Sequence, residues 1–336
     1  MSSSPISLVK TTTQHVIENA THVSLNRKAL IKTCSVIAET IKQKCKTSNS
    51  TSLIESLFIE WDNDTLHYRN LNEPELTCQY ILVLSSINFC FWPLNDSVKD
   101  EKDEFEYGHL ASGLRSVLQN NPNAFSSEEL KQLTSEKLTE WFNGAKVPLL
   151  SERVRLIREV GFALEEHFDG KAFNLIKSAN KSVNKLVSLV TQHFPGFRDH
   201  CIYSKTGHQI HFYKRAQIFC ADIYGCFKGQ GIGQFDDIND LTMFADYRVP
   251  QLLNILVYSD ELKEKISNLT VLEYSSQMEV EIRAFTIQAV EEMRKVLLEE
   301  HSIKCLSIEI DWMLWQIGEA NRKTIRPHHR TLSVYY

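Results

Sequence analysis

The spacing of apolar residues along the chain predicts a mainly α-helical protein. Over most of the 336 residues, apolar side chains recur every three or four positions, as they do along one face of a helix. One such face near the start of the chain carries Leu30, Cys34, Ile37 and Ile41. The same period predicts further helices over residues 126–142, 151–168, 183–194, 216–227, 251–266, 275–301 and 306–320.

Three stretches depart from this period. Residues 201–212 read as two short strands joined at Lys205-Thr206-Gly207, so we expect a small β-hairpin there. The apolar run 80–94 fits either a buried helix or a strand, because periodicity cannot separate the two in so apolar a run. We expect residues 1–20 to form a polar N-terminal segment and residues 21–336 a single compact α-helical domain.

Composition and charge narrow the class of protein. With 43% hydrophobic and 24% charged residues, the chain is typical of a soluble globular protein. Its net charge of −5 argues against a surface that neutralises many phosphates, so we expect no stable nucleic-acid partner. A small anionic ligand needs only a local basic cluster and stays possible.

The cysteines and the termini bear on compartment and cofactors. The eight cysteines show neither a C-x-x-C pair nor the paired Cys/His spacing of a zinc site, so we expect reduced thiols, no metal and no cofactor. No apolar run has the length of a signal peptide core or a membrane span. We therefore expect a cytoplasmic or nuclear protein with no membrane partner; nothing in the sequence indicates its oligomeric state.

Residues 212–251 hold the highest density of reactive and conformationally special residues. They include a basic pair, a glycine cluster and five aspartates. The glycines end the helix expected at 216–227, and a helical period resumes at Ile238, which predicts Asp237 at a helix N-terminus. There Asp237 is either an ordinary cap or, beside Phe235, a fixed anion that faces a developing cation, and sequence spacing leaves both interpretations open.

Two further patterns bear on ligand binding. In the helix expected at 306–320, Asp311, Trp312 and Gln316 fall near one another, which is typical of a pocket for a nucleobase, although the tryptophans of this helix fit a core role equally well. Gly229, Gly231 and Gly233 follow a helix and lack the G-x-G-x-x-G spacing, so they do not indicate a Rossmann nucleotide site.

Several of these runs resemble the queuosine salvage protein family, N-glycosidases that release queuine from queuosine 5'-monophosphate. Their order and spread cover nearly the whole chain, and the departure is Gly108-His109-Leu110, where the family usually has a Gly-Tyr-Trp step. The matching runs are NFCFW at 88–92, FPGFRD at 194–199, FYKRAQI at 212–218, F-x-D-I at 235–238, TMFADYRVPQ at 242–251, QMEVEIRA at 277–284 and the terminal HR…YY at 329–336.

The resemblance implies a hydrolase with a helical architecture similar to that of DNA glycosylases. It implies Asp237 as the catalytic carboxylate, with Asp246 as the alternative and Asp222 as a weaker third choice. Contacts to the substrate would come from His67, Phe235, Asp237, Asp311, Trp312 and Gln316. Contacts to the 5'-phosphate, or support behind the substrate, would come from Lys214, Arg215, Asp246, Tyr247, His329 and Arg330.

Two rival interpretations belong to other classes of protein. A DNA base glycosylase would present a basic binding face, which the acidic net charge disfavours. A catalytically inactive helical module for tRNA modification would keep the aromatic pocket but tolerate loss of Asp237.

Overall fold

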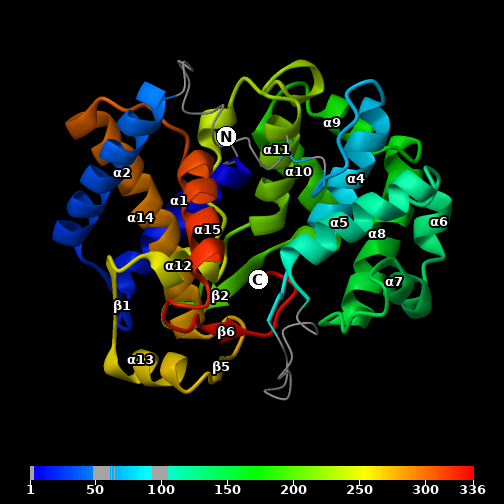
Figure 1. Ribbon diagram of the computed structural model, residues 1–336. Coiled ribbons are helices and arrows are strands. Elements are labelled where there is room, and N and C mark those ends of the chain that lie inside the picture. Colours follow the sequence, from blue (N-terminus) through cyan, green and yellow to red (C-terminus); the bar gives the residue numbers. More distant parts are fainter. Residues whose placement is uncertain (1–3, 48–60, 62, 64, 93–104) are drawn as a thin grey trace.

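The computed structural model describes residues 4–47, 61, 63, 65–92 and 105–336 (Figure 1). The described chain is mainly helical, which confirms the predicted class. The longer helices are α1 (Pro5–Asn19), α2 (Arg27–Thr47), α4 (Pro74–Ser86), α5 (Tyr107–Asn120), α8 (Leu150–Phe168), α10 (Val183–His193), α11 (Lys214–Cys226), α13 (Asp260–Ser267), α14 (Gln277–His301) and α15 (Ser307–Asn321). Shorter ones are α6 (Ser127–Lys131), α7 (Ser135–Trp141), α9 (Ala172–Ser178) and α12 (Arg248–Leu252), with single 3-10 turns at Pro195–Phe197, Gly231–Gly233 and Ile238–Asp240.

The described strands form three two-stranded sheets. The predicted hairpin is present: β2 (His200–Tyr203) pairs antiparallel with β3 (His208–His211), and His200 lies opposite His211. The other two sheets join distant segments, since β1 (Val23–Leu25) pairs antiparallel with β4 (Leu256–Tyr258) and β5 (Val271–Leu272) pairs parallel with β6 (Arg330–Thr331).

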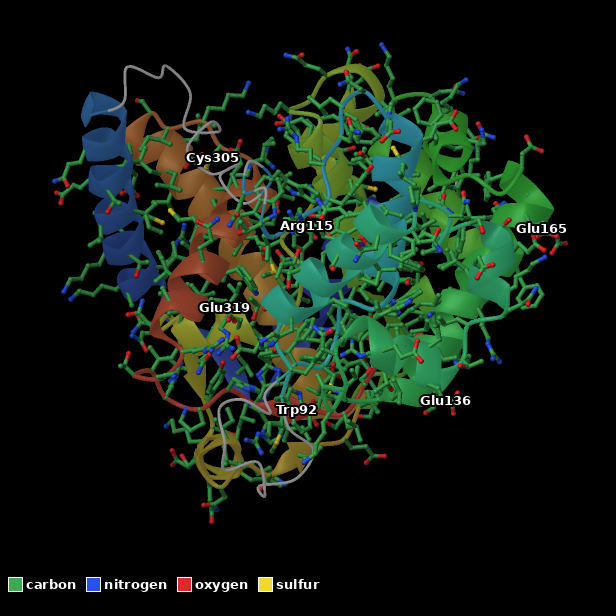
Figure 2. All side chains as sticks on the ribbon, turned by 45° about the vertical axis from the view of Figure 1, so that its right-hand side comes forward. Trp92, Arg115, Glu136, Glu165, Cys305 and Glu319 are labelled. Carbon is green, nitrogen blue, oxygen red and sulfur yellow. The ribbon has the colours of Figure 1, made fainter. Side chains whose placement is uncertain are left out.

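Two groups of helices surround two hydrophobic clusters (Figure 1). One group packs around α4, whose side chains from Thr77 to Ser86 are all buried, so the ambiguous apolar run begins as a buried helix. The other packs around α14, which contacts α1, α2, β1 and α15. In Figure 2, Glu136 and Glu165 lie at the outer edge of the first group, whereas Glu319 of α15 lies nearer the middle of the molecule.

The N-terminal residues form more than a polar segment. Helix α1 occupies 5–19 and packs against α14, burying Ile6, Val9, Thr13 and Val16. The Thr run at 11–13 obscures this face in the sequence, because Thr13 is polar yet buried, with its hydroxyl donating to the Val9 carbonyl. None of the described helices is long and apolar enough to cross a membrane.

Three predicted helices are wrong in extent. The one at 126–142 divides into α6 and α7, because the Thr134 hydroxyl caps a new helix by accepting the Lys137 N–H. The one at 251–266 is interrupted by β4, whose pairing with β1 outweighs the helical period. The helix expected after Asp237 is a single 3-10 turn, and no helix follows it directly. The Gln217 side chain of α11 accepts the Thr242 N–H, so this N–H does not bond a carbonyl one helical turn earlier.

Candidate active site

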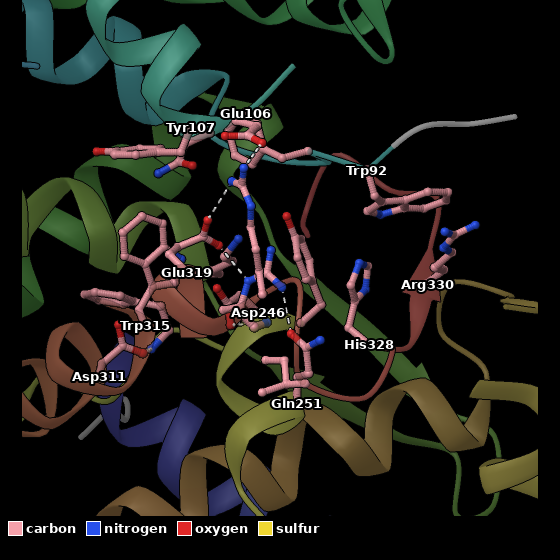
Figure 3. A pocket seen from close by; sticks show the side chains of 18 of the residues that line it. Trp92, Glu106, Tyr107, Asp246, Gln251, Asp311, Trp315, Glu319, His328 and Arg330 are labelled. Carbon is pink, nitrogen blue, oxygen red and sulfur yellow. Dashed lines mark hydrogen bonds and ion pairs between the residues drawn. The ribbon is translucent and has the colours of Figure 1, made fainter. Parts of the chain in front are cut away.

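A pocket of about 480 Å³ lies where α11, α15 and the 244–251 segment meet the start of α5 and the C-terminal segment (Figure 3). This volume falls within the range of small-molecule sites. The pocket is lined by Asn88, Phe91, Trp92, Glu106, Tyr107, Lys214, Ile218, Asp222, Phe244, Asp246, Tyr247, Arg248, Gln251, Leu269, Asp311, Trp312, Trp315, Glu319, Arg322, Lys323, Ile325, Pro327, His328 and Arg330.

Two carboxyl groups and a lysine line its buried part. Asp246 is 9% exposed, and its Oδ1 accepts the backbone N–H groups of Arg248 at 3.0 Å and Val249 at 3.1 Å. Asp311, 4% exposed, accepts the Phe244 N–H at 3.1 Å. These three backbone bonds fix both carboxyl groups, so the site is organised before a ligand enters.

Burial and the charges of neighbouring groups shift the pKa of Asp311 upward and that of Lys214 downward. Burial, reinforced by the charge of Asp246, raises the pKa of Asp311 well above its ordinary value and so favours its protonated form. Burial lowers the pKa of Lys214 to about 8 although the charge of Asp246 opposes that shift, so Lys214 stays mostly protonated at pH 7. The pocket therefore combines a carboxyl group whose protonated form is favoured with a lysine cation that interacts electrostatically with Asp246.

Aromatic rings form opposite ends of the pocket. At one end the Tyr107 and Trp315 rings meet edge to face with centroids 5.4 Å apart. Trp312, which lies on α15 with Trp315, also lines the pocket. At the other, the His328 ring stacks on Tyr247 at 4.4 Å, and the Arg330 guanidinium lies 5.5 Å from the Trp92 ring centroid. Figure 3 shows Trp315 and Asp311 on one side of Asp246, and His328, Arg330 and Trp92 on the other.

An ionic network closes one wall. The Arg248 Nε lies 2.6 Å from Glu319, and its Nη1 donates to the Gln251 side chain at 2.7 Å. Arg322 pairs with Glu319 and with Glu106, the residue before α5. Gly318 permits this arrangement, because a Cβ there would lie 2.7 Å from the Arg248 Cγ.

The queuosine salvage protein profile matches residues 66–336. The chain belongs to the queuosine salvage protein family. Among its relatives is a Dictyostelium discoideum protein named queuosine 5'-phosphate N-glycosylase/hydrolase, which is 46% identical and aligned over 99% of both chains. Proteins of the same name from Sphaerobacter thermophilus and Mus musculus are 35% and 34% identical, covering 98% and 78% of this chain and 97% and 82% of their own.

In this queuosine salvage protein, half of the residues singled out from the sequence line the pocket. They are Lys214, Asp246, Tyr247, Asp311, Trp312 and Arg330. Helices α11 and α15 also carry pocket residues that the sequence analysis left aside or ranked low, above all Asp222, Trp315 and Glu319. A helical signal existed for these, since Asp222 is eight residues from Lys214, and Trp315 and Glu319 follow Asp311 at four and eight residues.

Asp237 is not among the lining residues. Its carboxylate accepts hydrogen bonds from the Ser182 hydroxyl, the Val183 and Asn184 backbone N–H groups and the Asn184 side chain, all at the N-terminus of α10. Partial burial raises the pKa of Asp237, but these bonds outweigh it and hold the pKa below its ordinary value. The neighbouring Phe235 is buried in the hydrophobic core.

The remaining predicted residues lie outside the lining as well. The His67 Nδ1 lies 3.1 Å from the Tyr80 hydroxyl, its ring stacks on Trp61, and burial lowers its pKa to about 3. Arg215 donates to the carbonyls of Ser86 and Gly196 and so joins three segments of the core.

The last two sit close to pocket residues without lining the pocket. His329 lies next to His328 and Arg330 in the chain, and its Nε2 is 3.1 Å from the Tyr336 hydroxyl. Gln316 is half-buried on α15. Among the residues that the structure describes, no three His, Cys, Asp or Glu side chains converge as metal ligands would.

Proposed function

We propose that this protein hydrolyses the N-glycosidic bond of queuosine 5'-phosphate and releases queuine for salvage into tRNA modification. The names of its relatives support the reaction, since the alignment with the Dictyostelium protein covers nearly all of both chains. The pocket supports it independently, because it combines aromatic surfaces, carboxyl groups and cations, which suit a base, a reacting sugar and a phosphate.

The observation that carries the proposal is the placement of Asp246. Breaking the bond from C1' of the ribose to the base leaves positive charge on the sugar, while the bonding electron pair departs with the base. A fixed carboxylate stabilises that charge or traps it covalently until water attacks C1'. Asp246 is held for this task by two backbone N–H groups inside the pocket, so we assign it the catalytic role.

Asp237 is less suited to that role. Its two oxygens already accept four hydrogen bonds from the start of α10, and it does not line the pocket. A carboxylate so engaged would have to give up a helix cap before it could approach a sugar. Lys214, in contrast, lies close enough to Asp246 for the two side chains to interact electrostatically.

The departing base requires separate assistance. Queuine is a 7-deazaguanine, so the ring nitrogen that many enzymes protonate to expel a purine is a carbon. We infer that Asp311 hydrogen-bonds the base and that Trp312 and Trp315 border its faces, because all three lie on one helix beside Asp246. In its protonated form, which burial favours, Asp311 has an O–H to donate as negative charge develops on the leaving base.

The 5'-phosphate then lies at the opposite end. With the base at Trp315 and the sugar at Asp246, the phosphate points toward His328 and Arg330 (Figure 3). Arginine is well suited to phosphate through paired N–H donors. We therefore propose Arg330 as a phosphate contact.

Net charge and free thiols support two further inferences, one on whether the substrate is a free nucleotide and one on the cellular compartment. The net charge of −5 supports a free nucleotide rather than a nucleic acid as substrate. Free buried thiols at seven described cysteines support a reducing compartment such as the cytoplasm. An architecture similar to that of DNA glycosylases also remains our proposal, and superposition on such an enzyme tests it.

The decisive experiment is incubation of the purified protein with queuosine 5'-phosphate and detection of queuine by mass spectrometry. Wild type should release queuine, and Asp246→Asn should fold but lose about a thousandfold or more of the rate, as expected when the charge facing a transition state is removed. Asp237→Asn serves as the matched carboxylate control. Loss confined to Asp237→Asn would return the catalytic role to Asp237, and no release by wild type would refute the enzyme assignment.

A further inference from the structure

A buried ion pair behind the pocket ties together the segments that supply its charged residues. Arg283 of α14 has no exposed surface, and its two terminal nitrogens donate to both oxygens of Asp199 at 2.9 and 2.6 Å. Asp199 is 1% exposed. Neither residue lines the pocket, so neither contacts the substrate that we propose.

The pair holds two pocket segments directly. The Arg283 Nε donates to the carbonyl of Ala245 at 3.2 Å, one residue before Asp246. The Asp199 Oδ2 accepts the backbone N–H of Lys214 at 3.0 Å, at the first residue of α11. The relative placement of Asp246 and Lys214 thus depends on two side chains that bind each other.

The C-terminal segment rests on the same pair. The Tyr336 ring lies 5.0 Å from the Arg283 guanidinium, and the Tyr336 hydroxyl lies 3.1 Å from the His329 Nε2. His329 sits between His328 and Arg330, which both line the pocket. Three segments far apart in the sequence therefore reach the pocket from one buried centre.

Stability alone is a poor explanation for such a pair. Removing two charges from water is unfavourable, and apolar replacements of buried ion pairs are often neutral or stabilising. What the pair supplies is geometry, because the planar guanidinium fixes direction as well as distance. A catalytic carboxylate displaced by about 1 Å loses much of its effect.

We propose that the Arg283–Asp199 ion pair is a positioning element that sets Asp246 against Lys214 for catalysis. This inference rests on the function proposed above for the same pocket. Arg283 and Asp199 are positioning residues, since they act through Asp246 and Lys214.

The first test needs no activity. In Asp199→Asn the amide still accepts one hydrogen bond, but the charge that binds the planar fork of Arg283 is lost, and Glu279, 3.6 Å from the Arg283 Nη1, is the acidic partner that remains. Hydrogen exchange should then accelerate at Lys214 and over residues 244–249, where the Arg248 and Val249 N–H groups bond Asp246.

Glu281→Gln is the matched control for this exchange. Glu281 is also a fully buried carboxylate and lies on α14, but it accepts the N–H groups of Thr21, His22 and Val23, away from the pocket. In Glu281→Gln, hydrogen exchange should accelerate at residues 21–23 instead.

The second test is kinetic, with the same three proteins and queuosine 5'-phosphate. Asp199→Asn should lower kcat about tenfold or more and change KM less than about threefold. Glu281→Gln should lower the melting temperature yet keep kcat within about twofold. In an Asp246→Asn background, Asp199→Asn should have little further effect, because it acts through that carboxylate.

Wild-type exchange at 244–249 or a wild-type kcat in Asp199→Asn overturns the proposal, as does an equal loss of kcat in Glu281→Gln. Arg283→Lys, which keeps the charge but not the planar fork, should reproduce the Asp199→Asn result. If it does not fold, Tyr336→Phe replaces it and should accelerate exchange at 328–330. If wild type releases no queuine, the proposed function fails and the exchange measurement alone decides the positioning role.

Discussion

Replacing Asp237 by alanine should cost stability and spare catalysis. The change removes hydrogen bonds of 2.7 Å from the Ser182 hydroxyl, 2.6 Å and 3.2 Å from the Val183 and Asn184 N–H groups, and 3.0 Å from the Asn184 side chain. Loss of a helix cap costs roughly 0.5–2 kcal/mol. Because two N–H groups and two side chains lose their partner in a half-buried site, we expect about 2 kcal/mol.

The stability loss should depend on pH in a definite direction. The folded-state pKa of Asp237 lies below its ordinary value, because hydrogen bonds outweigh the opposing effect of burial. Its contribution is therefore fully present above the unfolded-state pKa and disappears as pH falls through the folded-state value. Wild type and Asp237→Ala should differ at pH 7 and begin to converge only as pH falls below about 4.

Thermal unfolding measured by circular dichroism tests this expectation. About 2 kcal/mol corresponds to a fall in melting temperature of roughly 3 °C for a chain of this size. Asp240→Ala is the control, since Asp240 accepts one bond from the same Asn184 side chain at 2.7 Å but is exposed, and it should change little. An unchanged melting temperature in Asp237→Ala, or loss of queuine release from the folded variant at 25 °C, would refute this account.

Three other substitutions probe the pocket and its support. Arg330→Gln should raise KM for queuosine 5'-phosphate about tenfold or more and leave KM for the nucleoside nearly unchanged in the release assay. Gly318→Ala should displace Arg248, whose Cγ lies 2.7 Å from the new Cβ, and lower the melting temperature by a few degrees, roughly 1–3 kcal/mol. Burial raises the pKa of Glu309 to about 7, so its stabilising contribution is present below about pH 4.5 and lost as pH rises through 7. In wild type, the free energy of unfolding measured in urea should fall by on the order of 3 kcal/mol from pH 5 to pH 8 because of Glu309, and Glu309→Gln should lack this fall. An identical pH dependence in both proteins would contradict this.

The sequence alone determined the helical class, the extent of the long regular helices and the family. Helix α14 follows its apolar period and begins after Ser276, and α8 follows its apolar period although it begins at Leu150, one residue before the expected Ser151, because amphipathic helices of good propensity are specified locally. The β2–β3 hairpin is also local, since its two strands are joined by a short turn. Asp311 and Trp312 lie on a helix that the period predicts, and both line the pocket.

Only the tertiary structure decided which aspartate faces the pocket. Phe235-Asp236-Asp237 and Phe244-Ala245-Asp246 have the same Phe-x-Asp spacing, so local pattern cannot rank them. The Asp237 carboxylate accepts hydrogen bonds from the start of α10, which is distant in sequence. The Asp246 carboxylate is held in the pocket by the Arg248 and Val249 N–H groups. After the turn at Ile238–Asp240 the chain between them does not continue as a helix, because Gln217 and Asp311 accept the N–H groups of Thr242 and Phe244. Such partners come from elsewhere in the chain, and a local pattern carries no information about them.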